Sequence, residues 1–372
     1  MPLSAEPALE VLSRLGAQPA TSFYESGVAL VVQRILSETG VDFQTDRYGN
    51  IMAKVPGHDP HRATGGTPPI AYVAHLDHPG FEAVTTDGDF LVARALGGVP
   101  PASFEAGVPL QVLLEDGRRI NATTAGRHGS HEDRQVLVQL EQAQSLSQPR
   151  PVVFDLVDFQ LDGDFIRMRA LDDLAGCGSI LAALSVLKDE SLPGDVYGVF
   201  TRAEEVGLVG ARLMGEARTL PPDTLVVSLE SSRTLPGAEI GSGPVIRVGD
   251  AGFTFNADAE AALIKARETL QARPQGFKVQ RQLMSGGTCE ASAFALYGYA
   301  TTGIAFPLGN YHNGAPEGGI EAEYIHREDF LGGVQLIVES ARSVAERKDT
   351  AFRRRLAEVP EELRGRLEKS IG

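Results

Sequence analysis

Two histidines and several carboxylates stand directly after apolar segments of this 372-residue sequence, where strands would end. These residues are His75, Asp77, Glu204, Glu205, Glu230 and His312. Asp172 stands just before a predicted helix, where its carboxylate also meets the positive end of the helix dipole. Open α/β sheets place their sites outside the carboxyl ends of their strands, so these side chains are expected to converge at one edge.

Anionic side chains concentrated at one edge of a sheet are unfavourable unless cations neutralise them. Two neutral imidazoles with several carboxylates suit a pair of divalent ions such as zinc, cobalt or manganese. A dinuclear hydrolytic site needs a carboxylate that bridges ions about 3.5–4 Å apart, further ligands on each ion, and a separate carboxylate as base. The residues above supply five ligands and a base. The pattern therefore predicts two divalent cofactor ions, zinc first, and metal-assisted hydrolysis.

The segments that must position these residues alternate between strand and helix. Continuous apolar runs are typical of strands covered on both faces, and they lie at 70–74, 196–201, 224–229 and 300–308. Amphipathic patterns predict helices at 174–189, 208–217, 258–272 and 329–349. This alternation predicts an α/β fold with a mixed, mostly parallel sheet sandwiched by helices.

The N-terminal region predicts a helix and a hairpin. Ser22 and Glu25 have the spacing of a capping box ahead of an apolar stripe, and Gly40 follows the last turn. Residues 41–57 predict two short strands around a turn. Residues 58–69 are rich in proline and glycine and predict an exposed loop.

Between residues 85 and 164 the pattern changes to short alternating segments separated by Gly, Asp, Asn and Pro. This pattern predicts an all-β module resembling a small barrel. The expected organisation is a catalytic α/β domain in two parts, 1–84 and 165–372, interrupted by an inserted β domain at 85–164. The tail from Ala351 carries six basic and four acidic side chains and predicts a solvated amphipathic helix.

Composition limits the partners and the location. The net charge of −15 argues against nucleic acid or an anionic membrane surface, because phosphate binding needs clustered Lys and Arg. No stretch approaches the about 20 apolar residues of a membrane span, and the first residues lack a secretory signal, so a cytoplasmic location is expected. Cys177 and Cys289 predict neither a disulfide framework nor a thiolate metal cluster, and the helical spacing around Cys177 places it in the core.

Six segments carry a resemblance to a known family: AHLDHPGF, IRMRALDDLAGCG, FTRAEEVGLVGA, GSGPVIRV, MSGGTCEA and PLGNYHN. Their order and approximate spacing resemble the tetrahedral and glutamyl aminopeptidases, cytosolic dinuclear metallopeptidases of the zinc-peptidase clan MH. The resemblance covers nearly the whole chain. It implies removal of N-terminal residues from peptide substrates, and a homo-oligomer such as a dimer or a twelve-subunit cage in which the small β insert takes part in assembly.

The resemblance also implies a role for each candidate residue. Asp172 would bridge two metal ions, and its peptide bond to Asp173 would be cis. Asp77 would hydrogen-bond the ring of His75 and fix its tautomer. Glu204 would be the general base. The terminal ligands would be His75 and Glu230 on one ion, and Glu205 and His312 on the other.

Three positions depart from the family pattern. Glu230 stands where the family usually has Asp, and resembles some related dinuclear carboxypeptidases and deacylases. His78 replaces the usual Glu after AHLD, and Cys289 replaces the usual Asp after GGT; both are expected near the substrate. Two alternatives therefore stay open: a carboxypeptidase or N-acyl amino acid hydrolase on the same scaffold, and a non-catalytic metal-binding assembly protein.

The remaining histidines are expected to be structural or solvated. His58 and His61 lie in the exposed loop, and His326 precedes a helix. His128 and His131 lie in the polar segment AGRHGSHED and are expected at the surface. Metal binding, or contact with a neighbouring subunit's site, is the lesser alternative for this pair.

Overall fold

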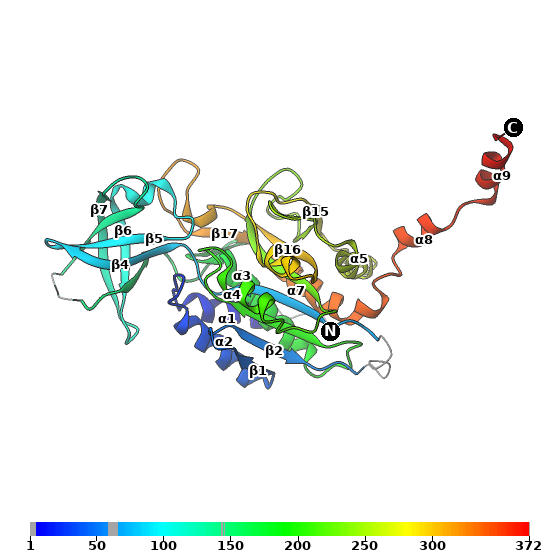
Figure 1. The fold of residues 1–372 in the computed structure, drawn as a ribbon, viewed down its shortest axis with the longest axis horizontal. Coiled ribbons are helices and arrows are strands. Elements are labelled where there is room, and N and C mark those ends of the chain that lie inside the picture. The colour runs from blue at the N-terminus through cyan, green and yellow to red at the C-terminus, as the bar shows by residue number, and fades with distance from the viewer. Residues whose placement is uncertain (1–4, 59–65, 143, 145, 372) are drawn as a thin grey trace.

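The computed structural model describes residues 5–58, 66–142, 144 and 146–371 of the chain. At its centre is an eight-stranded mixed sheet in the order β1-β2-β12-β3-β13-β16-β14-β15 (Figure 1). The strands are β1 Asp42–Thr45, β2 Ile51–Val55, β3 Ile70–His75, β12 Val196–Thr201, β13 Leu225–Arg233, β14 Val245–Arg247, β15 Gln280–Gln282 and β16 Ala300–Leu308. β12, β3, β13 and β16 are mutually parallel neighbours. The predicted mixed, mostly parallel sheet is therefore confirmed.

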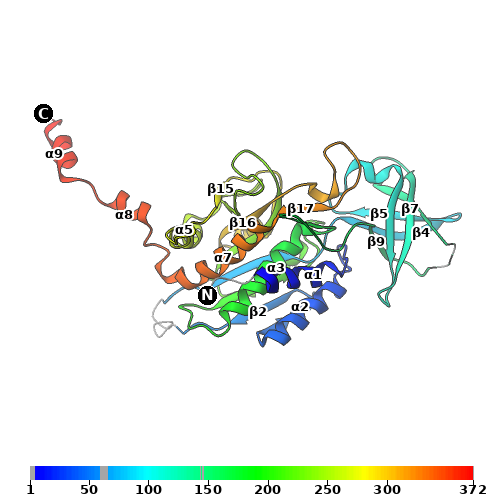
Figure 2. The same cartoon turned by 180° about the vertical axis from the view of Figure 1, so that it is seen from behind.

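Helices cover both faces of this sheet, as Figures 1 and 2 show from opposite sides. They are α1 Ala5–Gly16, α2 Ser26–Thr39, α3 Leu171–Leu187, α4 Val209–Glu216, α5 Ala257–Gln271, α6 Glu290–Leu296 and α7 Arg327–Ser343. Two further helices, α8 Ala351–Ala357 and α9 Glu361–Lys369, lie in the C-terminal tail. Alternate residues of β3 enter two cores: Tyr72 packs with α1, α3 and α7, whereas Val73 packs with α4 and α6. Because both faces are buried, β3 is apolar throughout.

A closed six-stranded barrel forms one end of the molecule (Figure 2). Its strands are β4 Gly80–Asp87, β5 Phe90–Leu96, β6 Ala106–Leu113, β7 Arg119–His128, β8 Gln135–Leu140 and β9 Arg150–Phe154. The barrel has its own core, in which the Phe81 ring meets Phe104 and Phe154 edge to face at 6.1 and 5.9 Å. Its strands span residues 80–154 and so lie earlier than the expected 85–164 insert at both ends.

Residues 160–164 lie outside the barrel because they join a separate three-stranded sheet. Its strands are β10 Gln160–Asp162, β11 Phe165–Met168 and β17 Glu323–His326. β11 lies between the other two and pairs with each in antiparallel register. This small sheet ties the end of the barrel insert to the segment that leads into α7.

The start of α2 differs from the prediction. α2 begins at Ser26, but Glu25 makes no side-chain cap, so the predicted capping box is wrong. The Ser22 hydroxyl instead donates to Asp77 Oδ2 at 2.6 Å, and Glu25 Oε1 accepts the Ala203 backbone N–H at 2.9 Å. Both polar side chains thus bind segments that are distant in the sequence.

Other elements agree with the sequence patterns or extend them. α2 ends at Gly40 in the left-handed conformation (φ 73°), as predicted. α1 and the three-residue strands β14 and β15 were not predicted. The tail forms two helices, α8 and α9, that extend away from the body (Figures 1 and 2). Among the described residues, no helix has the length and apolar character needed to cross a membrane.

Candidate metal centre

The carboxyl ends of four neighbouring strands bring the candidate ligands together. His75 is the last residue of β3 and pairs in register with Thr201, the last residue of β12. Glu204 and Glu205 follow Thr201 by three and four residues, and Glu230 lies in β13. His312 follows β16, and Asp172 lies in the first turn of α3, with a cis peptide bond to Asp173.

Asp172 lies between the two histidines. Its Oδ1 is 3.5 Å from His75 Nε2, and its Oδ2 is 3.6 Å from His312 Nε2. His312 Nε2 is also 3.7 Å from Glu205 Oε1. These separations are longer than hydrogen bonds of about 2.7–3.2 Å. They suit ligand atoms that share a cation through bonds of about 2.0–2.2 Å each.

Two donor groups share Asp172. Donor atoms of His75, Asp172 and Glu230 all lie within 4.8 Å of one another, and so do those of Asp172, Glu205 and His312. A third group of the same compactness contains His75, Glu204 and Glu205. The carboxylate of Glu230 therefore belongs to the cluster, although its side chain is one methylene longer than that of the usual Asp.

Two buried oxygens of the cluster have no hydrogen-bond donor among the described residues. They are Asp172 Oδ1 and Glu230 Oε1, both members of the same donor group. A buried acceptor without a partner costs about 1–3 kcal/mol. A divalent cation at this position would satisfy both oxygens, so the residues present fit a metal ion.

The charges of the cluster also favour a cation. Burial raises the pKa of Glu204 well above its ordinary value. Burial likewise raises the pKa of Glu205 to about 7, and burial together with the charge of Asp172 raises that of Glu230. Against the effect of burial, the two imidazole rings hold the pKa of Asp172 at about 2. The carboxylates thus resist ionising together, and positive charge among them would relieve their repulsion.

Asp77 holds the backbone around the cluster. Its carboxylate accepts the backbone N–H groups of Glu204 at 3.0 Å and Glu205 at 3.2 Å, besides the Ser22 hydroxyl. The ring of His75 bonds through Nδ1 to the backbone carbonyl of Asp77 at 2.9 Å, while the carboxylate Oδ1 lies 3.7 Å away. The contact expected between His75 and the Asp77 carboxylate is therefore made by the Asp77 carbonyl, which leaves Nε2 facing Asp172.

Glu323 is a site residue that the sequence analysis missed. It is 1 % exposed, and its Oε2 accepts the backbone N–H groups of Leu171 at 2.7 Å and Asp172 at 3.0 Å. Its Oε1 accepts the backbone N–H of His312 at 2.9 Å. One buried carboxylate thus fixes the two segments that carry Asp172 and His312. Its sequence context shows only one glutamate among several, so no local signal distinguished it.

We expect Glu323→Gln to weaken metal binding by about 10–100-fold, the usual cost of losing an outer partner of metal ligands. The amide has one oxygen and cannot accept the N–H groups on both sides of the cluster. Titration of the metal-depleted protein with zinc measures the affinity directly. Glu328→Gln, an exposed change at the start of α7, is the matched control. Equal zinc affinity in the two variants would contradict the role of Glu323.

The barrel insert contributes to the centre through the segment after β5. His312 Nδ1 bonds to the Gly98 carbonyl at 2.9 Å, which leaves its Nε2 facing Asp172 and Glu205. A Cβ atom at Gly98 would lie 2.5 Å from His312 Nδ1, so only glycine fits there. The ring of this ligand is therefore held by the inserted barrel and its backbone by Glu323.

His78 and Cys289, which were expected near the substrate, are both buried side chains. His78 is buried; its Nε2 accepts the Ala20 N–H at 3.2 Å, and its Nδ1 contacts the Pro79 carbonyl at 3.1 Å. Burial lowers the pKa of His78 to about 3, so the ring is neutral. Cys289 is also buried, and its N–H donates to Asp250 Oδ2 at 3.1 Å. Both departures from the family pattern are therefore held by internal hydrogen bonds.

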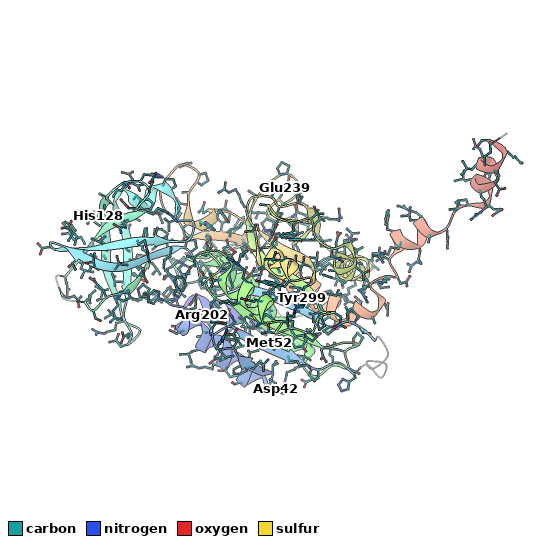
Figure 3. The ribbon with its side chains drawn as sticks, in the orientation of Figure 1. Asp42, Met52, His128, Arg202, Glu239 and Tyr299 are labelled. Atoms are coloured by element: carbon teal, nitrogen blue, oxygen red, sulfur yellow. The ribbon has the colours of Figure 1, made fainter. Side chains whose placement is uncertain are left out.

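The other singled-out residues have structural or surface positions. Cys177 is buried in the main core, as predicted. His326 caps α7 by accepting the Glu328 N–H at 3.1 Å. His128 contacts Gln135 at 3.1 Å on the barrel. Figure 3 shows His128 at the barrel end of the molecule, apart from Arg202. His58 and His131 are exposed, and His61 lies outside the described residues.

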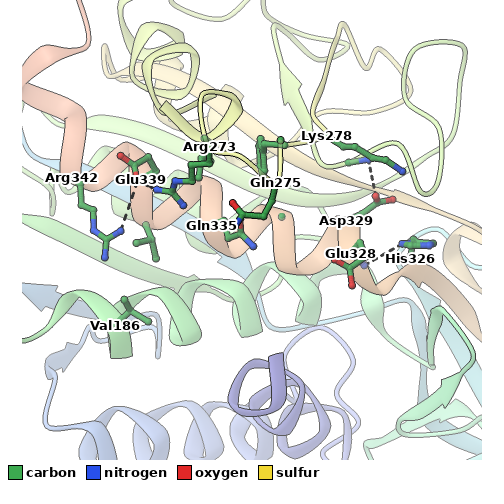
Figure 4. Close-up of a pocket in the computed structure, with 16 residues that line it drawn as sticks. Val186, Arg273, Gln275, Lys278, His326, Glu328, Asp329, Gln335, Glu339 and Arg342 are labelled. Carbon is green, nitrogen blue, oxygen red and sulfur yellow. Dashed lines mark hydrogen bonds and ion pairs between the residues drawn. The ribbon is translucent and has the colours of Figure 1, made fainter. Parts of the chain in front are cut away.

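A groove of about 770 Å³ lies beside α7 (Figure 4). Its acidic side chains already have partners. Glu339 pairs with Arg273 at 2.6 Å and with Arg342 at 3.8 Å, and Asp329 accepts backbone N–H groups of the 241–243 segment. None of the candidate metal ligands lines it.

The α/β sandwich, the inserted barrel and the shared acidic and imidazole cluster together define a metallopeptidase. The chain belongs to the M42 glutamyl aminopeptidase family, whose model matches residues 49–331. It is a metal-dependent aminopeptidase, as the resemblance implied. The carboxypeptidase, N-acyl hydrolase and non-catalytic alternatives are not favoured.

Solved structures share the fold over almost the whole chain. The TET1 peptidase of Pyrococcus horikoshii is 25% identical, with a TM-score of 0.73 over 90% of this chain and 99% of that chain. An aminopeptidase of Desulfurococcus kamchatkensis is 23% identical, with a TM-score of 0.75 over 91% and 95%. A TET aminopeptidase of a marine sediment thaumarchaeon is 20% identical, with a TM-score of 0.76 over 91% and 99%.

Proposed function

We propose that this aminopeptidase holds two divalent cations, zinc by preference, around Asp172. Asp172 is the shared ligand because each of its carboxylate oxygens faces a different histidine. That single observation carries the proposal. The terminal ligands are His75 and Glu230 on one side, and Glu205 and His312 on the other.

The bound ions supply Lewis acidity, which lowers the pKa of water and stabilises the oxyanion that forms on the scissile carbonyl. Glu204 carries the proton: its carboxylate accepts a proton from the attacking water and returns it to the nitrogen of the leaving peptide. The Glu204 backbone is fixed by Asp77, while Glu204 Oε2 lies 4.0 Å from His75 Nε2, at the edge of the cluster. Burial favours protonation of this carboxylate, which suits a group that must take up and release a proton.

The substrate is a peptide with a free N-terminus. The match to the glutamyl aminopeptidase family supports a free N-terminus as the end of the substrate that is recognised. The protein acts as a homo-oligomer. The TET1 peptidase of Pyrococcus horikoshii, which can assemble into a tetrahedron or a large octahedral shell, supports this part of the proposal.

Reconstitution tests the proposed function. Metal-depleted protein is loaded separately with zinc, cobalt and manganese, and bound metal per subunit is counted. Each form is then assayed on amino acid p-nitroanilides, on their N-acetylated counterparts and on peptides blocked only at the N-terminus. We expect two ions per subunit and cleavage of free-amine substrates alone. Faster hydrolysis of the N-acetylated compounds would overturn the assignment.

A further inference from the structure

The C-terminal arm, defined as residues 351–371 with α8 and α9, is unlike the rest of the molecule. It extends away from the body in both views (Figures 1 and 2). Neither helix has a buried residue. The two helices are seven and nine residues long. Helices this short are marginal in water without a packing partner.

The arm carries six exposed apolar side chains, which are called the apolar stripe here. Its members are 52 to 86 % exposed and are Phe352, Leu356, Val359, Leu363, Leu367 and Ile371. Phe352 and Leu356 lie four residues apart in α8, and Leu363 and Leu367 lie four residues apart in α9, so each pair shares one face of its helix. Val359 and Ile371 follow the ends of the two helices. Single exposed apolar residues are ordinary, but a contiguous stripe marks an interaction surface.

The root of the arm is fixed to the body. Thr350 is buried, and the Ala351 N–H donates to the Glu268 carboxylate at 3.0 Å. Arg353 Nη2 lies 3.5 Å from Asp258 Oδ1, at the start of α5. The arm therefore begins at a fixed point beside α5.

Charge indicates which neighbour fits. The arm has six basic and four acidic side chains and therefore a net charge of +2. Residues 1–350 have a net charge of −17, which gives the total of −15. Two arms would repel each other, but an arm and the acidic body of another copy attract. An anionic membrane would attract the arm while repelling the much larger charge of the body.

We propose that the C-terminal arm docks on the body of a second copy of this chain, with the apolar stripe as its contact face. The arm then exchanges between subunits and adds a contact separate from the metal centre. This inference does not depend on the proposed metal chemistry, because no arm residue belongs to the cluster.

Molar mass in solution tests the stripe. The metal-loaded full chain and the variant L356E/L363E/L367E are compared by light scattering over a range of concentrations. The control R364Q/R366Q/K369Q changes three arm residues outside the stripe and lowers the charge of the arm by the same three units. We expect the variant to dissociate at a concentration at least tenfold higher than the full chain and the control, and circular dichroism to show all three folded. Equal dissociation of the variant and the control would overturn the proposal.

Cross-linking tests the partner surface. A full chain with p-benzoylphenylalanine in place of Leu367 is mixed with a mass-tagged full chain carrying L356E/L363E/L367E, and products are mapped by mass spectrometry. We expect links from the arm of the first chain to residues 1–350 of the tagged chain. Links confined to arm residues would overturn the proposal. Arm-dependent sedimentation with phosphatidylglycerol vesicles at unchanged mass would also overturn it, in favour of a membrane surface.

Discussion

Glu204→Gln is expected to lower kcat by about 10²–10⁴-fold while leaving bound metal unchanged. Glutamine has the shape of glutamate but cannot accept the water proton and return it to the leaving nitrogen. The Glu204 backbone N–H, held by Asp77, is unaffected by the change. Because Glu204 is assigned proton transfer rather than metal binding, the two readouts should separate.

Steady-state kinetics on a free-amine p-nitroanilide, with metal counted on the same sample, measures both effects. Glu216→Gln, an exposed change on α4, is the matched control and should match the unaltered protein. Near-normal kcat in Glu204→Gln would remove Glu204 from the mechanism. Loss of metal in Glu204→Gln would instead show that Glu204 is a metal ligand. Its position in one donor group with His75 and Glu205 allows that role.

Asp172→Asn is expected to abolish turnover and to weaken binding of both metals by more than about 100-fold, beyond the loss of an outer partner. The neutral amide offers one oxygen, whereas the two donor groups each need a carboxylate oxygen of residue 172. The change preserves the size of the side chain, so packing around the start of α3 is kept. Metal loss and activity loss should therefore occur together.

Zinc titration and peptide hydrolysis on the same preparation test this coupling. Asp189→Asn, an exposed change just after the other end of α3, controls for the substitution itself. Retention of two ions with tight affinity in Asp172→Asn would contradict the shared-ligand role. Retention of one ion would assign residue 172 to a single metal.

Much of the sheet could be predicted because its strands are apolar on both faces. The strand from Ile70 to His75 is buried at every position, so its apolar run and the polar residues after it were both visible in the sequence. The three-residue strands at 245–247 and 280–282 were not, because they are too short for a periodicity and are defined by pairing. The barrel begins as early as Gly80, and only residues 76–79 separate it from β3, so no long linker marked the boundary in the sequence.

The candidate ligands could be predicted because most of them stand at or beyond the end of an apolar strand, whereas their supports could not. Glu323 and Gly98 act on His312 from a different strand and from the inserted barrel, and only tertiary structure brings those segments together. Ser22 and Glu25 matched a local capping motif, yet they bind distant backbone and side-chain groups. A local signal was present there, but a long-range contact replaced it.

Anomalous diffraction from a crystal grown with excess zinc tests the central claim most directly. We expect two peaks at the zinc edge, about 3.5–4 Å apart, with one Asp172 oxygen on each. His75 and Glu230 should contact the first peak, and Glu205 and His312 the second. A single peak, or two peaks that Asp172 does not join, would contradict the account.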